Sequence, residues 1–339
     1  MAEFVGIGDL HLTSPFGKGV TGGLSAYIDN HDDMVADLVI NQPLRYAEKK
    51  GIEHIILYGD LSEKPRLTYE GMLALTRILE QPFQFHIILG NHDLFGEDPA
   101  LGHSLQIIKK MGMKNVHLYE KPTDVVLDKA PVRFLPWPHA KFHKTALNVA
   151  HVDVQGARSD SGRLLESSDL TASKATAVIG HIHTRQRVRN SWFSGTLYQT
   201  NFGENGDKSF HHITYTKGDW EIEDIPVKPT YRLHTVEALT KGDLKNVPAS
   251  KFDLVKLILL DGNDLTAADY NHLKVVRQRA VSTERDLALA RIEDLHDGAE
   301  IEFNTNEFFD EWLELQQVDD NLKKEAIKLR DKILRSTKC

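Results

Sequence analysis

The sequence predicts an α/β fold, and two patterns along the chain of 339 residues support this class. Short apolar, β-branched runs alternate with longer amphipathic segments through the first two-thirds of the chain, as they do in β–α–β units. Several of the apolar runs are followed at once by Gly-Asp or Gly-His, where a strand is expected to end. Because crossover helices place consecutive strands in parallel, we expect a largely parallel sheet here.

The strands and helices of this first part can be assigned in order. Helices are expected near residues 30–50 and 68–81, between the first three strands. From about residue 124 the strands are shorter and carry turn signals between them. The predicted strands are Glu3–Ile7, His54–Tyr58, Gln84–Leu89, Asp124–Leu127, Val132–Leu135, Leu147–Ala150, Ala175–Ile179, Val188–Phe193, Ser209–Tyr215 and Trp220–Ile225.

A proline-bounded break, PVKP at Pro226–Pro229, predicts a domain boundary. We expect a first domain over residues 1–228 and a smaller α/β domain over residues 229–303. The smaller domain should contain a strand at Asp253–Leu260 and a helix at Ala267–Ala280.

Residues 304–339 are charge-rich and predict a helical tail, with an apolar stripe that includes Phe308 and Trp312. Such a helix can dock on its own domain or bind a partner, and the stripe fits both.

Composition excludes several function classes. The formal charge is −8, from 41 Lys and Arg against 49 Asp and Glu, which disfavours a general basic coat for nucleic acid but leaves room for a local basic groove. The single cysteine, Cys339, rules out a disulfide framework and predicts a reducing, cytoplasmic setting. No apolar run is long enough for a membrane span and no secretion signal is evident, so a soluble protein is expected.

Polar groups with metal-binding chemistry follow five of the predicted strands. Ligands of α/β sheets collect at the carboxyl ends of strands, so groups far apart in sequence can meet there. Each group is weak evidence alone, since Gly-Asp turns and core histidines are common, but five in one order predict a shared metal site. They are Asp9 and His11, Asp60, Asn91 with His92 and Asp93, His151, and His181 with His183.

The ligand types are chemically coherent. Two carboxylates, one amide oxygen and four imidazoles can fill two adjacent metal positions if one carboxylate bridges them. Mixed oxygen and nitrogen ligands suit Mn²⁺, Fe²⁺ or Zn²⁺ better than Mg²⁺ or Ca²⁺. Two ions about 3.5–4 Å apart acidify a bound water and clamp the oxygens of a displacement at phosphorus. The expected reaction is phosphoester hydrolysis.

The order DxH, GD, GNHD, H and GHxH over residues 9–183 resembles the calcineurin-like metallophosphoesterases. This resemblance implies a four-layer αββα sandwich with a small α/β capping domain and a helical C-terminal tail. It also implies that Asp60 bridges the two metals. The first metal would then take Asp9, His11, Asp60 and His183, and the second Asp60, Asn91, His151 and His181.

The same resemblance gives His92 a catalytic role, with its ring beside the scissile phosphate and Asp93 orienting that ring. The alternative for His92 is a purely structural role. His139 and His143 also fall in the interval of the fourth motif. His151 is preferred because LNVAHVDVQGA reads as a strand running into a loop, whereas His139 follows the turn-like Pro136–Pro138.

A second stretch, FSGTLYQTNFGE at Phe193–Glu204, resembles the SbcD nuclease subunits, relatives of the meiotic recombination eleven nuclease. The resemblance implies a Mn²⁺-dependent DNA exonuclease and endonuclease of a phage that acts in end processing, recombination and double-strand-break repair. It implies an SbcC-like coiled-coil ABC ATPase partner gripped by the tail, a homodimer, and the host cytoplasm if the protein is phage-encoded. One departure stands at Glu63, where related enzymes usually carry a histidine.

Substrate contacts are predicted at Arg185, Arg187 and Arg189, whose spacing of two would align them on one face of an extended strand. They could neutralise DNA phosphates, or form a solvated strand face. Glu63 is a further candidate for contact with the substrate.

Two other functions remain open at this point. One is a phosphatase or small-molecule phosphodiesterase of the same superfamily. The other is a metal-free assembly scaffold.

Overall fold

The computed structural model covers the whole chain and divides into two units, Met1–Asp297 and Gly298–Cys339. Every residue that the structure describes belongs to the first unit. The predicted tail, residues 304–339, lies outside the described residues, and the three-domain division stays a prediction. The structure describes residues 1–12, 24, 27–96, 102–103, 105–160, 162, 164–165, 175–204, 206–284 and 286–287.

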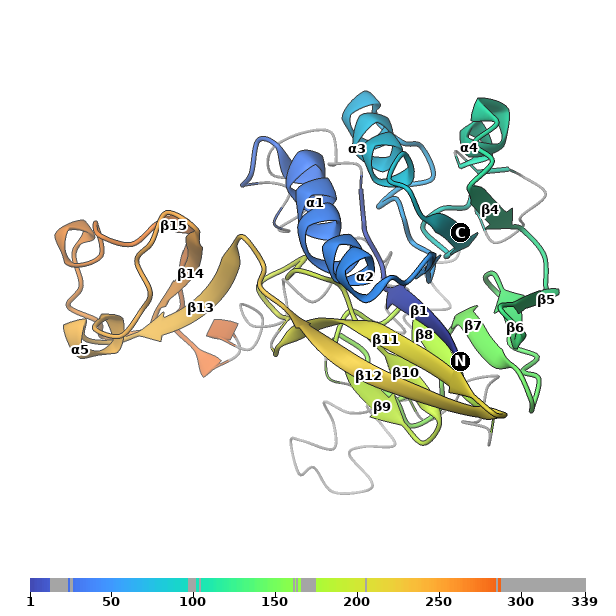
Figure 1. Cartoon of the computed structure of the whole chain (residues 1–339). Coiled ribbons are helices and arrows are strands. Elements are labelled where there is room, and N and C mark those ends of the chain that lie inside the picture. The colour runs from blue at the N-terminus through green and yellow to red at the C-terminus, as the bar shows by residue number, and fades with distance from the viewer. Residues whose placement is uncertain are drawn as a thin grey trace, which may run out of the picture. The chain divides into compact units, whose positions relative to one another are not determined.

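The first of two six-stranded sheets carries the parallel strands that the sequence predicts (Figure 1). Strands β1 to β4 run in parallel, and β11 pairs antiparallel with both β1 and β12. The sheet order is β12-β11-β1-β2-β3-β4, with β1 at Ala2–Ile7, β2 at His54–Leu57, β3 at Gln84–Ile88, β4 at Val116–Tyr119, β11 at Lys208–Thr216 and β12 at Asp219–Val227.

Helices cover one face of this sheet (Figure 1). Alternate strand residues such as Val5 and Ile7 pack against them, while Phe4 faces the other way. Pro43 explains why the first helical segment is not one α-helix, because proline lacks an N–H and crowds the preceding turn. The helices are α1 at His31–Val39, a π-helical turn η2 at Ile40–Leu44, α2 at Arg45–Lys50, α3 at Tyr69–Leu79 and α4 at Gln106–Met111.

The second sheet packs on the other face of the first, which confirms the α/β sandwich. Phe4 and Tyr58 of the first sheet share a core with Phe134 and Val149 of the second. Strands β6, β7, β8 and β10 are parallel, with antiparallel edges. The order is β5-β6-β7-β8-β10-β9, with β5 at Thr123–Leu127, β6 at Ala130–Leu135, β7 at Leu147–His151, β8 at Ala177–Gly180, β9 at Gln186–Val188 and β10 at Ser191–Phe193.

The outer face of the second sheet differs from the expected helical layer. Ile179 and Phe193 pack there against Val152, Val154 and Ile182, which belong to loops. Within the described part of the chain no helix covers this face, so the fourth layer consists there of loop residues.

A third, three-stranded parallel sheet follows the proline-bounded break, ordered β13-β14-β15. The predicted helix at Ala267–Ala280 is wrong, because only a 3₁₀ turn, η4, forms at Ala267–Asp269 and the rest ends in β15. The β-branched start of that strand, Val275 and Val276, favours extended backbone over helix. The elements are β13 at Arg232–Ala238, α5 at Lys241–Leu244, β14 at Asp253–Leu259 and β15 at Val275–Ala280.

The predicted strand Val188–Phe193 is also wrong, because the chain turns back within it. Arg189 has a positive φ of 54°, and β9 and β10 pair antiparallel on either side of the turn.

Among the residues described, no helix has the length and apolar character needed to cross a membrane.

Candidate metal centre

Glycines let the strand ends approach one another at the predicted site. A Cβ on Gly90 would lie 2.0 Å from Asp60 Oδ1, and one on Gly59 would lie 2.7 Å from the Nδ1 atom of His151. Gly59 also has a φ of +95°, a region that favours glycine. The glycines that precede Asp60 and Asn91 therefore make room for the side chains of the cluster.

Three predicted ligands have left-handed backbone, although none is glycine. Their φ values are 47° for His11, 45° for Asp60 and 86° for His181. Such conformations cost of order 1–3 kcal/mol each and gather at functional sites, where surrounding structure holds them. The fold therefore keeps a strained backbone in order to aim these side chains.

The first group of candidate ligands joins the ends of β1 and β8. His11 Nε2 lies 2.9 Å from His183 Nε2, so two ring nitrogens face each other. Asp9 Oδ1 accepts a hydrogen bond of 3.0 Å from the backbone N–H of His181, while Asp9 Oδ2 is buried with no hydrogen-bond partner. A buried carboxylate oxygen without a donor, beside imidazole nitrogens, fits a cation ligand.

The second group joins the ends of β2, β3, β7 and β8. His151 Nε2 lies 3.1 Å from Asp60 Oδ2 and 2.9 Å from Asn91 Oδ1. His181 Nδ1 lies 3.0 Å from the same Asn91 oxygen. Asp60 also groups with Asp9 and His11, with one potential ligand atom per residue all within 4.8 Å of one another. Asp60 is thus shared by both groups, as a bridging ligand would be.

Each imidazole of the two groups has a partner on its other ring nitrogen. Such contacts fix the tautomer that leaves the inner nitrogen free for a metal. The outer contacts are His151 Nδ1 to the Tyr58 carbonyl at 2.8 Å, His183 Nδ1 to Glu204 at 3.1 Å, His11 Nδ1 to Glu63 at 2.8 Å and His181 Nε2 to Asp153 at 3.4 Å.

Electrostatics give the buried histidines a strong affinity for positive charge. Burial opposes protonation of His151, but the Asp60 carboxylate outweighs it and raises the pKa of that histidine to about 9. For His183, burial is outweighed by Asp160 and Glu204, and the pKa rises to about 10. The same pairing with His151 overcomes burial and holds the pKa of Asp60 well below its usual range. A divalent cation would take the place of these protons.

The NFGE stretch forms the support for His183. Glu204 is fully buried, hydrogen bonded to the ring of His183, and paired with the buried ammonium of Lys208. Asp160 accepts the backbone N–H of His183 at 2.8 Å. Sequence reasoning noted the NFGE stretch only as a resemblance and missed Asp153, Asp160 and Lys208. Lone acidic residues in loops carried no signal.

His92 lies beside the first group, but Asp93 does not orient it, and that prediction is wrong. His92 Nδ1 donates to the carbonyl of Glu63 at 2.9 Å. Asp93 accepts instead from Gly90 N at 2.9 Å and from the backbone and hydroxyl of Ser62, each at 3.1 Å. Burial, reinforced by Asp60, raises the pKa of Asp93 to about 6. Asp93 thus ties the loop after β3 to the loop after β2.

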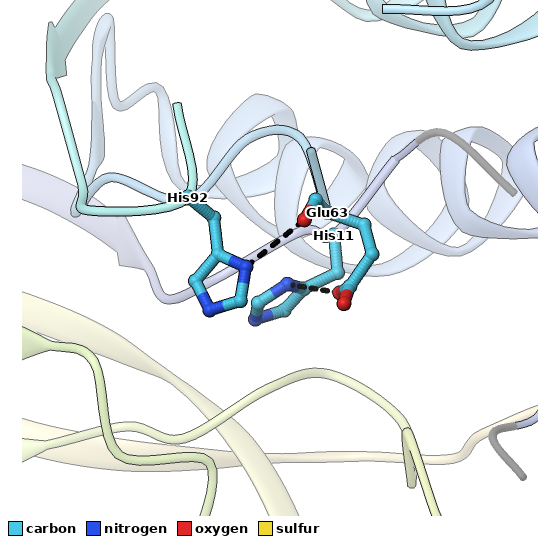
Figure 2. Close-up of side chains that lie close together, drawn as sticks. All are labelled: His11, Glu63 and His92. Atoms are coloured by element: carbon cyan, nitrogen blue, oxygen red, sulfur yellow. Dashed lines mark hydrogen bonds and ion pairs between the residues drawn. The ribbon is translucent and has the colours of Figure 1, made fainter. Parts of the chain in front are cut away.

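Glu63 lies between two histidines of the site (Figure 2). Its carboxylate is ion-paired with His11, and its carbonyl accepts from His92. Burial alone would raise the pKa of Glu63, but the bond with His11 outweighs it and lowers that pKa. In the structure this carboxylate contacts a predicted metal ligand.

The three arginines do not form the predicted stripe. Arg187 lies on β9 with its guanidinium 4.3 Å from the centre of the Trp192 ring, and its Nε donates to the Arg189 carbonyl. Arg189 lies in the turn after β9, and Arg185 precedes the strand, 4.0 Å from Asp207. Their spacing of two therefore does not correspond to one strand face.

The donor set fits transition-metal ions. Imidazole nitrogens with carboxylate and amide oxygens suit Mn²⁺, Fe²⁺ or Zn²⁺. His151 is fully buried in the cluster, whereas His139 and His143 are exposed. Trp137 stacks on His181 with ring centres 5.4 Å apart and so shields one side of the cluster.

The chain is similar to exonuclease subunit 1 of Enterobacteria phage T4. The two are 25% identical over 215 residues, a match that covers 58% of this chain and 62% of the phage protein. The chain therefore spans less than two-thirds of that relative's length. No protein-family profile matches the chain.

Proposed function

We propose that this chain is a dinuclear metal-dependent DNA nuclease subunit that hydrolyses phosphodiester bonds. The observation that carries the proposal is the pair of ligand groups that share Asp60 at the carboxyl ends of parallel strands. Similarity to a phage exonuclease subunit supports DNA as the substrate over a small phosphoester.

The residues divide into two metal positions. Asp9, His11, Asp60 and His183 would hold one ion, and Asp60, Asn91, His151 and His181 the other, with Mn²⁺ preferred to Fe²⁺ or Zn²⁺. Bound there, the ions would lower the pKa of a water and polarise the phosphate oxygens.

The protein itself would supply proton transfer through His92. With Nδ1–H held by the Glu63 carbonyl, Nε2 is the nitrogen left to protonate the leaving oxygen. The stacked Trp137 and the buried loop residues would limit water around the second position.

We also propose that the subunit works in DNA end processing and recombination with an SbcC-like coiled-coil ATPase. The phage relative is named a subunit, which supports a partner. The helical tail at residues 304–339 is the proposed partner contact, a homodimer is the proposed assembly, and the cytoplasm of a host cell is the proposed location.

The test is hydrolysis of linear duplex and single-stranded DNA by the purified full chain. We expect cleavage with Mn²⁺, loss after treatment with a chelator, and recovery when Mn²⁺ is restored. An SbcC-like coiled-coil ATPase, the proposed partner, should increase cleavage. No cleavage under any of these conditions would refute the nuclease.

The same preparation tests the other functions. Faster hydrolysis of p-nitrophenyl phosphate or cyclic nucleotides than of DNA would indicate a phosphatase or small-molecule phosphodiesterase. Metal analysis that finds no bound ion after Mn²⁺ loading would indicate a scaffold.

A further inference from the structure

Glu63 contacts two different histidines of the site through two different groups. Its carboxylate Oε2 lies 2.8 Å from His11 Nδ1, and its backbone carbonyl lies 2.9 Å from His92 Nδ1. Figure 2 shows both rings beside this one residue. The remaining ring nitrogen of His11, Nε2, faces His183 at 2.9 Å.

The backbone of Glu63 is itself fixed against the loop that carries His11. Glu63 N–H donates to the carbonyl of Leu12 at 2.7 Å, and Leu12 forms a bridge with Ser62. Asp93 binds Ser62 from the third strand end. The Glu63 carbonyl is therefore held in place by contacts that do not involve its own side chain.

We infer that Glu63 is a positioning residue for both histidines, an inference that rests on the proposed nuclease function. Its carboxylate, ion-paired with His11 Nδ1 at 2.8 Å, favours a proton on that nitrogen, so that Nε2 is free to bind a metal. A carboxylate partner also makes an imidazole ligand more basic. Its carbonyl fixes the His92 ring independently. The side chain thus acts on metal affinity, and the main chain acts on proton transfer.

This division predicts that Glu63→Gln, which leaves the backbone unchanged, affects only metal binding. Loss of the carboxylate partner of a metal-binding imidazole typically costs about 10–100-fold in affinity. We expect calorimetry on the full chain to show two Mn²⁺ ions, one of them bound about 10–100-fold more weakly than in wild type. At saturating Mn²⁺ the fold-loss in kcat for DNA hydrolysis should be smaller than the fold-loss in Mn²⁺ affinity, since His92 keeps its carbonyl contact.

Glu3→Gln is the matched control. Glu3 makes a similar pair, 3.1 Å from His212 Nε2, and its side chain is 30% exposed against 21% for Glu63. It lies at the amino end of β1, away from the strand ends that carry the ligands. Its substitution should leave both Mn²⁺ affinities unchanged.

The His11 ring provides a second readout that a purely structural role would not change. In nitrogen-detected NMR of metal-free protein, at a pH where His11 is neutral, wild type should show His11 protonated at Nδ1, and Glu63→Gln should show a mixture of tautomers. Glu63→Ala should give the same shift if the glutamine variant folds poorly, as judged by circular dichroism. An unchanged His11 tautomer in the variants would overturn the inference.

The outcomes separate the inference from the function on which it rests. If wild type binds Mn²⁺ and cleaves DNA but Glu63→Gln binds Mn²⁺ with wild-type affinity, the inference alone is overturned. The inference alone is also overturned if Glu63→Gln binds fewer Mn²⁺ ions than wild type, because Glu63 would then be a metal ligand. Wild type that binds no Mn²⁺ would overturn both.

Discussion

Two histidine clusters have different neighbours: one lies at the carboxyl ends of strands from both six-stranded sheets, and the other lies on strands of the first sheet. At the carboxyl ends of the strands, imidazoles stand among carboxylates that raise the pKa of His151 to about 9. Toward the other ends, His86 contacts His54 at 3.0 Å and stacks on His117 and Phe134. Burial, with some repulsion from the other two histidines, lowers the pKa of His86 to about 3.

The difference shows that neighbours, not the histidines themselves, decide which cluster can attract a cation. Carboxylates favour positive charge at the first cluster, whereas burial and like neighbours disfavour it at the second. We call the second set, His54, His86 and His117, the aromatic histidine cluster.

The largest effect should come from Asp60, which both ligand groups share. Asp60→Asn removes the charge of the proposed bridging ligand, so the affinity for both ions should fall by more than about 100-fold. This exceeds the loss of about 10–100-fold that is typical when only a partner of a metal ligand is removed. DNA cleavage should fall to background. Calorimetry with Mn²⁺ measures this. His86→Phe, in the aromatic histidine cluster, is the control and should bind Mn²⁺ as wild type does. An equal loss of Mn²⁺ affinity in Asp60→Asn and His86→Phe would contradict the difference between the two histidine clusters.

His92 lies beside the ligands but is not one of the proposed ligands. His92→Ser should lower kcat by about 10²–10⁴-fold, the usual contribution of general acid catalysis. Mn²⁺ affinity should not change, because the backbone N–H of His92, which bonds Asp60 at 2.9 Å, is retained. Rates at saturating Mn²⁺ with parallel calorimetry separate the two quantities. A loss of metal would assign His92 a ligand role instead.

Glu204 supports His183 from inside the core. Glu204→Gln should weaken one Mn²⁺ position by about 10–100-fold. It also leaves the buried Lys208 ammonium unpaired, which should cost about 3–5 kcal/mol of unfolding free energy. Urea denaturation measures the second effect.

Glu120→Gln is the control for Glu204. Glu120 also contacts a histidine and a lysine, His103 and Lys109, but is 30% exposed. Exposed pairs contribute about 0–1 kcal/mol. A similar loss of stability in the two variants would show that burial of Glu204 is not the cause.

The aromatic histidine cluster should be sensitive to acid. The folded-state pKa of His86, about 3, lies below its unfolded value of 6.5, so unfolding takes up a proton between these values. The stability that neutral His86 contributes is fully present above pH 6.5. It is lost as the pH falls from 6.5 toward 3, by up to about 1.4 kcal/mol of unfolding free energy per pH unit. Unfolding free energies at pH 8, 6 and 5 should fall less steeply in His86→Phe than in wild type. Parallel pH profiles would contradict the role of His86.

Local patterns were sufficient for the strands that carry the site. Apolar runs followed by Gly-Asp or Gly-Asn placed β1, β2 and β3 within one residue of their observed ends. Local patterns failed at residues 267–280, where pairing with β14 made a strand of the predicted helix. They failed again at Arg189, because the turn that divides β9 from β10 depends on pairing between them.

The order of the motifs along the chain was enough to bring Asp9, Asp60 and Asn91 together, because parallel strands end at one edge of a sheet. The contacts that hold the side chains of the site in place became visible only in the folded protein. These contacts come from groups that are distant in the chain from the side chains they hold. They are the carbonyls of Glu63 and Tyr58, the carboxylate of Glu204 and the backbone N–H of Ser62. Hydrogen bonds between residues distant in the chain leave no local pattern, so the roles of Asp93 and Glu63 could be read only from the fold.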